Sequence, residues 1–413
     1  MPDGSNLRDL PLLTNRTERL SGTVKSTPED FRVEEIPLYE LEGDGPHLYM
    51  DMTKRNITTD RALEILRDFF GDRNQEFGVA GRKDKRAVTT QRISLEHLEP
   101  EEVKDFHHEK ISLTVLGYHR NKLQPGHLEG NRFTLKIREL EIEDEESLPN
   151  RLNQLAQKGV PNYFGPQRFG RRNDSDDLGE AMVQDQLDRF LDLYLGQPRD
   201  VDPPACREAR KLYETGDYED ALDAWPGQER NKKRALATFL DRGDPLPVLS
   251  SIPKSRRQLF LSAYQSRIFN ELLADRMPAI DRVREGDIAK KTDTGGLFEV
   301  QKPDKEQPRA DAFDISPTGL LPGGDPWMAE GSPGKRERTI LQENNLSSEK
   351  FDKVGYLRSD GTRRPFRFSP GQPRWERGRD DRGPYGQLEF TIPSGCYATV
   401  LLREILQDPP PSS

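Results

Sequence analysis

The sequence predicts an α+β protein whose first and last segments share one sheet around a largely helical middle. Apolar residues alternate in steps of two, as in strands, in residues 31–36, 47–52, 91–95, 111–116 and 130–137. From residue 174 on, the apolar spacing becomes helical. The strand-like residues 387–392 and the apolar helical residues 400–406 have the pattern of a buried core. We therefore expect the end of the chain to complete the amino-terminal sheet, with the middle as an insertion.

The elements of the first third follow from local signals. Residues 1–18 are expected to be a polar arm, and residues 77–80 and 87–91 to be short strands. A helix is predicted from residue 60 to Phe70, capped by Thr58 or Thr59 and ended by Gly71. Residues 148–158 are predicted to form a helix ended by Gly159.

In the remainder, helices are predicted at residues 178–195, 205–213 and 254–277, and a hairpin at 287–300. Residues 317–335 and 375–385 are interpreted as loops because they are rich in glycine and proline or in charge. Ser394 is expected to cap the final helix.

Composition excludes several classes of protein. The 413 residues are 33% charged and carry a net charge of -9, although 63 are Lys or Arg, so a nucleic-acid-binding surface requires segregated cations. The two cysteines and six histidines show no metal-ligand spacing, which argues against a metal enzyme. No apolar run is long enough to span a bilayer. We expect a cytoplasmic protein, because two lone cysteines fit a reducing compartment.

The most informative stretch is the loop that follows the expected strand at residues 77–80. Gly81 allows a sharp turn, and Asp84 then stands among four cations, Arg82, Lys83, Lys85 and Arg86. A carboxylate is an anion at neutral pH and can act as a nucleophile without an activating base. The cations would suit a polyanionic substrate. The alternative is a basic hairpin loop in which Asp84 only neutralises its neighbours.

Two other stretches could contact nucleic acid. Residues 159–172 interleave aromatic residues with glycine, proline and arginine, which suits base stacking and phosphate contact, although the same composition could form a rigid corner between domains. Phe133 lies on one face of the strand at 130–137, where simple core packing is the alternative.

Several stretches together resemble the TruD family of tRNA pseudouridine synthases. They are residues 25–31, 81–91, 130–133, 159–170, 261–270 and 392–404, in family order. The most specific are Lys-Asp-Lys-Arg-Ala-Val-Thr from Lys83 and Asn-Tyr-Phe-Gly-Pro-Gln-Arg-Phe-Gly from Asn162. The middle of the chain departs most, and its length resembles archaeal members.

The resemblance implies a pseudouridine-synthase catalytic domain with a mixed β-sheet flanked by helices, and a largely helical α+β TRUD insertion domain. We place the catalytic domain at residues 1–165 and 371–413 and the insertion at 166–370. The implied enzyme is an isomerase, an intramolecular transferase, that converts a uridine of tRNA, typically at position 13 in the D arm, to pseudouridine.

The resemblance also assigns roles to residues. Asp84 matches the catalytic aspartate, Lys25 a basic residue that pairs with it, Phe133 the aromatic that stacks on the target base, and Asn131 a polar residue beside it. Attack at ribose C1′, attack at uracil C6 and removal of a ribose proton all remain open. Further candidate substrate-binding residues in the matching stretches are Arg82, Lys83, Gln91, Tyr163 and Arg168.

The implied partner is tRNA, with no metal, organic cofactor, membrane or obligatory protein partner. An RNA-binding protein without catalytic activity is the alternative function. A phosphate-handling enzyme ranks last, because residues 78–83 lack the spacing of a P-loop and its Lys-Ser/Thr end.

Overall fold

The computed structural model describes residues 4–14, 19–71, 76–140, 148–352 and 357–406. The chain divides into two compact units: residues 12–161 with 368–413, and residues 1–11 with 162–367. We call these the sheet unit and the helical unit. The unit borders fall between residues 161 and 162 and between residues 367 and 368, and the first eleven residues group with the helical unit. None of the described helices is long and apolar enough to cross a membrane.

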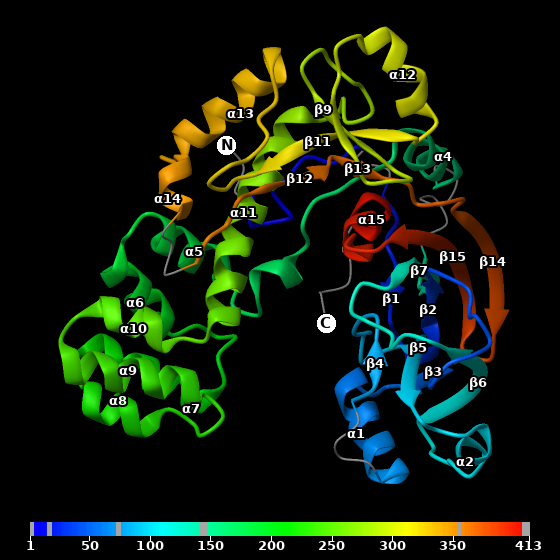
Figure 1. Cartoon of the computed structure of the whole chain (residues 1–413), viewed down its shortest axis with the longest axis horizontal. Helices are drawn as coiled ribbons and strands as arrows, with labels where there is room; N and C mark the ends of the chain where they lie inside the picture. The colour runs from blue at the N-terminus through cyan, green and yellow to red at the C-terminus, as the bar shows by residue number, and fades with distance from the viewer. Residues whose placement is uncertain (1–3, 15–18, 72–75, 141–147, 353–356, 407–413) are drawn as a thin grey trace. The chain divides into compact units, whose positions relative to one another are not determined.

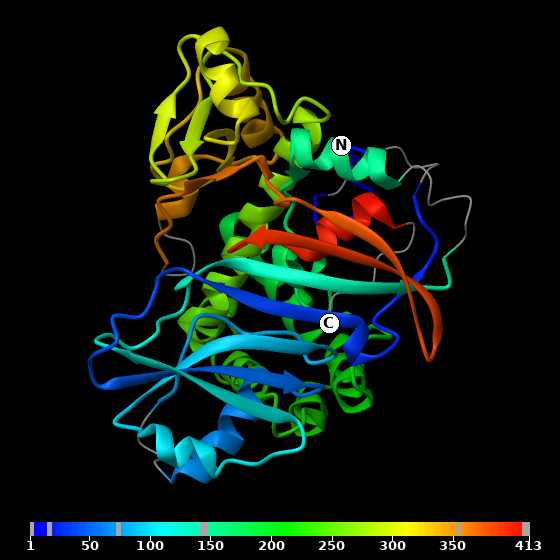
Figure 2. The ribbon, with the colours of Figure 1, turned by 90° about the vertical axis from the view of Figure 1, so that its right-hand side faces the viewer.

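The sheet unit is built on a nine-stranded sheet in the order β14-β15-β7-β2-β5-β3-β6, with β1 paired to β7 and β4 paired to β5 (Figure 2). The sheet is mixed, because β2 and β5 are parallel whereas the other pairs are antiparallel. Its strands are β1 (Thr23–Val24), β2 (Phe31–Pro37), β3 (His47–Arg55), β4 (Gly78–Val79), β5 (Val88–Glu96), β6 (Ile111–His119), β7 (Leu128–Arg138), β14 (Arg374–Asp380) and β15 (Gly383–Pro393).

Short helices accompany this sheet. They are η2 (Pro28–Asp30), α1 (Thr59–Phe70), α2 (Pro100–Lys104), α4 (Leu148–Lys158) and α15 (Ala398–Ile405), and the short strand β8 (Val160–Pro161) follows α4. One apolar cluster joins α1 to β3 and β5, through residues such as Leu66, Met50 and Ile93. The side chain of Thr58 caps α1 and Gly71 ends it in the left-handed conformation, as predicted.

The end of the chain completes the sheet, as predicted. Phe390 of β15 stands directly opposite Phe133 of β7 in an antiparallel register. Leu401 and Leu402 of α15 are buried. The expected cap is wrong: α15 starts from Tyr397 rather than Ser394.

The helical unit is organised along α11 (Lys254–Arg276). In Figure 1, α6 to α10 gather at one end of α11, and β11 and β12 lie toward its other end. The remaining helices are η3 (Pro166–Phe169), α5 (Ser175–Val183), α6 (Leu187–Leu195), α7 (Pro204–Thr215), α8 (Tyr218–Ala224), α9 (Arg230–Arg242), α10 (Pro245–Ser251), α12 (Pro303–Asp311), α13 (Gly331–Glu343) and α14 (Ser348–Asp352). A four-stranded sheet contains β9 (Ile288–Lys291), β10 (Leu297–Glu299), β11 (Ile315–Leu321) and β12 (Thr362–Pro365), and β13 (Arg367–Phe368) follows at the unit border.

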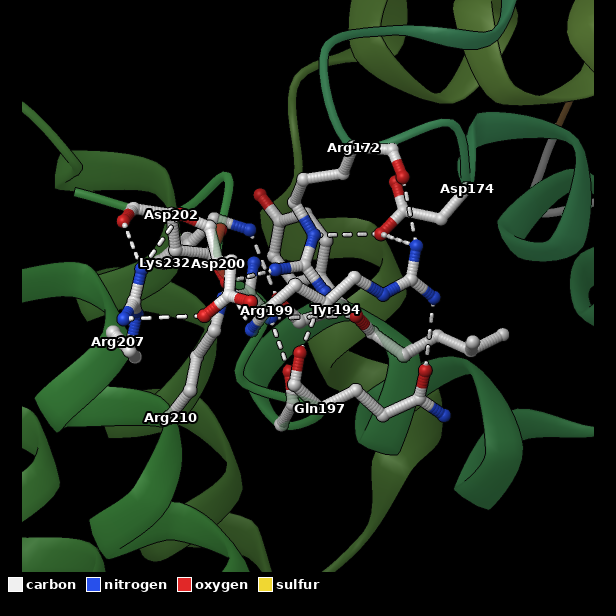
Figure 3. Close-up of polar contacts among 12 residues, drawn as sticks. Arg172, Asp174, Tyr194, Gln197, Arg199, Asp200, Asp202, Arg207, Arg210 and Lys232 are labelled. Atoms are coloured by element: carbon white, nitrogen blue, oxygen red, sulfur yellow. Dashed lines mark hydrogen bonds and ion pairs between the residues drawn. The ribbon is translucent and has the colours of Figure 1, made fainter.

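Buried ion pairs hold the segment between η3 and α7 within the helical unit (Figure 3). Arg172 donates to Asp174 at 2.6 Å, to Asp202 and to the backbone oxygen of Gln197 at 2.9 Å. Arg199 donates to the backbone oxygen of Arg172 at 2.7 Å. Arg172 is therefore a structural cation in this unit.

Four further sequence expectations are wrong in this fold. The polar arm is partly core, because Leu7, Leu10 and Leu13 are buried. The helix expected at 178–195 is two helices, broken where Asp185 adopts a left-handed φ of 57°. The loop expected at 317–335 contains most of β11 and the start of α13, and the loop expected at 375–385 is the β14–β15 hairpin.

Candidate active site

Asp84 and Lys25 form an ion pair within the sheet unit. Asp84 lies between β4 and β5, and the Nζ of Lys25, just after β1, lies 3.0 Å from Asp84 Oδ2. The Asp84 side chain is 33% exposed, so solvent or a substrate reaches it, whereas Lys25 is 13% exposed. Lys25 has a left-handed φ of 62°, which is uncommon for a residue with a side chain. Such strain is typical of functional sites, since the fold must hold it in place.

Lys83, the residue before Asp84 in the loop, has its side chain in the interior. Its ammonium lies 2.7 Å from Glu35 Oε2 of β2 and donates to Asn131 Oδ1 of β7 at 2.6 Å. The side chains of Lys83 and Glu35 are 6% and 1% exposed. The structure thus brings Lys83 and Asn131 together, and this buried group ties the Asp84 loop to two central strands.

Gln91 supports the same loop from β5. It is fully buried, and its amide donates to the backbone oxygen of Gly81 at 2.9 Å. The hydroxyl of Thr59 donates to the Gln91 side-chain oxygen at 3.0 Å and accepts from the backbone N–H of Lys83 at 3.0 Å. The position of Gln91 therefore matches a residue that holds the loop rather than one that faces solvent.

Phe133 sits in an aromatic group beside the ion pair. Its ring is stacked on Phe390 with centroids 5.1 Å apart and meets the edge of Phe31 at 5.9 Å. The ammonium of Lys25 lies 4.0 Å from the centroid of the Phe31 ring. Phe133 is only 7% exposed, so it packs in the core and borders the Asp84–Lys25 pair through Phe31.

The other loop cations are exposed. Arg82 pairs with Asp60 of α1 at 3.0 Å, with both side chains largely in solvent. The side chains of Lys85 and Arg86 are exposed and form no ion pair with a described residue.

Tyr163 and Arg168 belong to the helical unit. Tyr163 is fully buried. Arg168 donates to the hydroxyl of Ser266 on α11 at 3.0 Å, and its guanidinium lies 5.4 Å from the Phe164 ring centroid. Within this unit, Tyr163 is an interior residue and Arg168 contacts Ser266 and Phe164.

Sequence reasoning missed Glu35, Phe31, Phe390 and Lys54. Lys54 of β3 is fully buried, and its ammonium donates to the backbone oxygen of Asp84 at 2.7 Å. Burial lowers the pKa of Lys54 to about 8, opposed by the charge of Asp84. A signal for Lys54 was present, because strand alternation places it on the face of Met50 and Met52.

The model of the tRNA pseudouridine synthase D (TruD) family matches residues 9–405. The chain belongs to the TruD family. It is 38% identical to the tRNA pseudouridine synthase D of Geobacter metallireducens, over 94% of this chain and 95% of that one. It is 33% identical to the probable tRNA pseudouridine synthase D of Methanosarcina acetivorans, over 97% and 96%. A crystal structure of a TruD chain from Methanosarcina mazei matches with a TM-score of 0.86 at 30% identity, covering 97% of this chain and 96% of that one.

Proposed function

We propose that this TruD chain is a tRNA pseudouridine synthase in which Asp84 is the catalytic residue. The proposed target is a uridine of the D arm, at position 13. The isomerisation breaks the bond between uracil N1 and ribose C1′ and forms one between uracil C5 and C1′. A proton leaves C5 and N1 gains one, so no other reactant is consumed.

The observation that carries the proposal is the Asp84–Lys25 pair. The carboxylate is solvent-accessible, and an ammonium 3.0 Å away fixes its orientation. An oriented anion beside a substrate can attack C1′ or C6 or remove a ribose proton, and the proposal covers all three routes. Orientation matters because misplacing a catalytic group by about 1 Å can cost on the order of 100-fold in rate.

The aromatic group supports the same proposal. A uridine must leave its stack to reach an enzyme carboxylate, and an apolar face is needed to receive it. Phe31 and Phe133, which are 3% and 7% exposed, are the aromatic side chains next to Lys25 from which such a face would form. A phenyl ring carries no proton to donate, so these residues bind rather than act as acid or base.

The proposal includes no metal, organic cofactor or obligatory protein partner, and it places the enzyme in the cytoplasm. The two cysteines, Cys206 and Cys396, are not joined in a disulfide, which fits a reducing compartment.

The decisive test is Asp84→Asn, which keeps the shape of the side chain and removes its charge. We expect pseudouridine formation on a tRNA substrate to be lost, while tRNA affinity is kept or rises because an anion has left a cationic site. Melting temperature should change little, since the side chain is partly exposed. The matched control is Asp60→Asn on the neighbouring helix, which also removes a carboxylate paired with a loop cation.

Three results separate the functions. Loss of product with retained binding supports the synthase. If the wild type binds tRNA but forms no pseudouridine on any tRNA tested, the result supports an RNA-binding protein without catalysis. Pseudouridine formed by Asp84→Asn at the wild-type rate rejects Asp84 as the catalytic residue.

A further inference from the structure

Lys54 is a buried cation placed among apolar side chains. It stands near the end of β3, where alternation puts it on the same face as Met50 and Met52, and all three side chains are fully buried. Moving an isolated ammonium out of water is costly unless every donor finds an acceptor. A lysine at this position therefore needs a specific reason.

The ammonium makes three hydrogen bonds, one for each of its N–H donors. It donates to the backbone oxygens of Ile57 at 2.8 Å, Asp84 at 2.7 Å and Lys83 at 3.3 Å. Lys54 forms no ion pair with a described carboxylate, so backbone carbonyls alone satisfy its donors. Two of the three belong to the catalytic loop, and the third to the turn that follows β3.

The turn after β3 contacts the loop a second time. The backbone N–H of Asn56 donates to the oxygen of Ala87 at 3.1 Å, and Asn56 is left-handed with a φ of 51°. Together with Lys54, this turn fixes the loop at residues 83, 84 and 87.

The pKa of Lys54 also depends on the charge of Asp84. Burial lowers the pKa of the ammonium, the charge of Asp84 raises it, and the charge of Lys83 lowers it. Lys83 is in turn paired with Glu35. Asp84 is thus the carboxylate whose charge opposes the effect of burial on the pKa of Lys54.

We infer that Lys54 is a positioning residue for the reaction: it fixes the backbone of Asp84 and adds an internal positive charge to the one that Lys25 supplies at the carboxylate. This role rests on the proposed function of Asp84. A fixed charge inside the fold needs no reorganisation during the reaction, which is why such groups are effective.

The test uses Lys54→Met, which keeps the length of the side chain and removes its charge and donors, and Lys54→Gln, which keeps amide donors without charge. Rates are measured in single turnovers with enzyme in excess, at a temperature where every variant is folded. We expect both variants to lose roughly 100-fold in rate with tRNA affinity unchanged. We expect Lys54→Gln to recover melting temperature but not rate.

The matched control is Arg151→Met in the same unit. Arg151 of α4 is also a buried cation that donates to a backbone carbonyl, at 3.0 Å, but its acceptor is Ile405 of α15. This variant should lower the melting temperature and keep the single-turnover rate. Lys54 variants whose rates match the wild type, or fall only in step with melting temperature as in the control, would overturn the positioning role.

A readout that needs no turnover separates this inference from the proposed function. Amide hydrogen exchange of residues 81–87 should accelerate in Lys54→Met and not in Arg151→Met. If the wild type forms no pseudouridine, the proposed function fails while the exchange result still tests the contact. Equal exchange in all variants rejects Lys54 as the residue that holds the loop.

Discussion

Phe133 packs in the core and also has a proposed stacking role. A substitution that tests stacking must therefore keep the packing volume. Phe133→Ala would open a cavity in a nearly closed site and cost about 3–5 kcal/mol of stability. Phe133→Leu keeps most of the volume and removes only the aromatic face. Since a base stacked on an aromatic ring gains about 1–3 kcal/mol, we expect Phe133→Leu to slow single turnovers by roughly tenfold or more.

The control for this substitution is Phe106→Leu. Phe106 is 9% exposed, close to the 7% of Phe133, and belongs to the apolar cluster around α1 and α2. It should lose a similar amount of stability and keep its rate. Equal rates for the two variants would leave Phe133 as a core residue alone.

The pKa of Lys54 predicts a pH dependence with a definite sign. In the folded chain burial lowers this pKa to about 8 from the ordinary 10.5. Between these values the unfolded chain binds more protons, so the contribution of Lys54 to the free energy of unfolding rises as pH rises from about 8 to 10.5. The cost of the buried charge is complete below pH 8. The difference in unfolding free energy between wild type and Lys54→Met, followed by denaturant titration, should show this slope.

Between pH 8 and 10.5 we expect the rate of pseudouridine formation to fall while the free energy of unfolding rises. Above pH 8 the ammonium loses its charge and one donor, so the single-turnover rate of the wild type should fall while stability gains. A wild-type rate that stays flat from pH 7 to 9.5 would contradict this coupling.

The sequence singled out Asp84, the proposed catalytic residue, more readily than the residues that hold its loop. Asp84 was visible because one acid stands among four cations. Lys83 belongs to the same run of charges, but it turns inward to Glu35, because a strand 48 residues earlier in sequence supplies its partner. No local sequence pattern predicts an ion pair between residues so far apart in the chain. The position of Lys54, in contrast, could be predicted from the sequence, because strand alternation places it on the apolar face of β3.

Many elements with a buried face were predicted, although the buried strand β11 lies where a loop was expected, and β14, which has no buried residue, was missed. β14 is the edge strand of the sheet, and none of its residues is buried. Backbone hydrogen bonds to β15 therefore define it, and apolar alternation does not. The break between α5 and α6 was missed for a related reason: apolar spacing continues across it, and only the backbone of Asp185 marks it.

The closing helix α15 is held by its own buried carboxylate. Glu404 is fully buried and accepts from the backbone N–H groups of Leu13 and Thr14 at 3.0 and 2.9 Å, and from the Thr14 hydroxyl at 2.9 Å. In Glu404→Gln, one acceptor oxygen becomes a donor and faces another donor. We expect a loss of about 1–3 kcal/mol of stability, measured by denaturant unfolding.

Glu101→Gln on α2 is the control, because that side chain is 74% exposed. If Glu404→Gln were as stable as this control, the carboxylate would not be what holds residues 13 and 14 to α15.

The whole molecule carries a net charge of -9, so tRNA binding depends on where cations remain without partners. The sequence suggested the four cations of residues 82–86, together with Arg168, Arg171 and Arg172, as phosphate contacts. Ion pairs within the units engage several of these: Arg82 with Asp60, Lys83 with Glu35, and Arg172 with two aspartates. The number of displaced counterions should therefore be smaller than the count of basic residues implies.

Lys85 and Arg86 are the loop cations expected to contact phosphates. Because a cation that binds phosphate releases a counterion, the logarithm of tRNA affinity should fall linearly with the logarithm of salt concentration. Lys85→Gln and Arg86→Gln should each reduce that slope by about 1 and leave melting temperature unchanged. Lys104→Gln on α2, whose exposed side chain pairs with Glu101, should not alter the slope.

A wild-type affinity that is independent of salt would contradict an electrostatic interface altogether. A wild-type slope that both loop variants retain would instead assign the phosphate contacts to other cations.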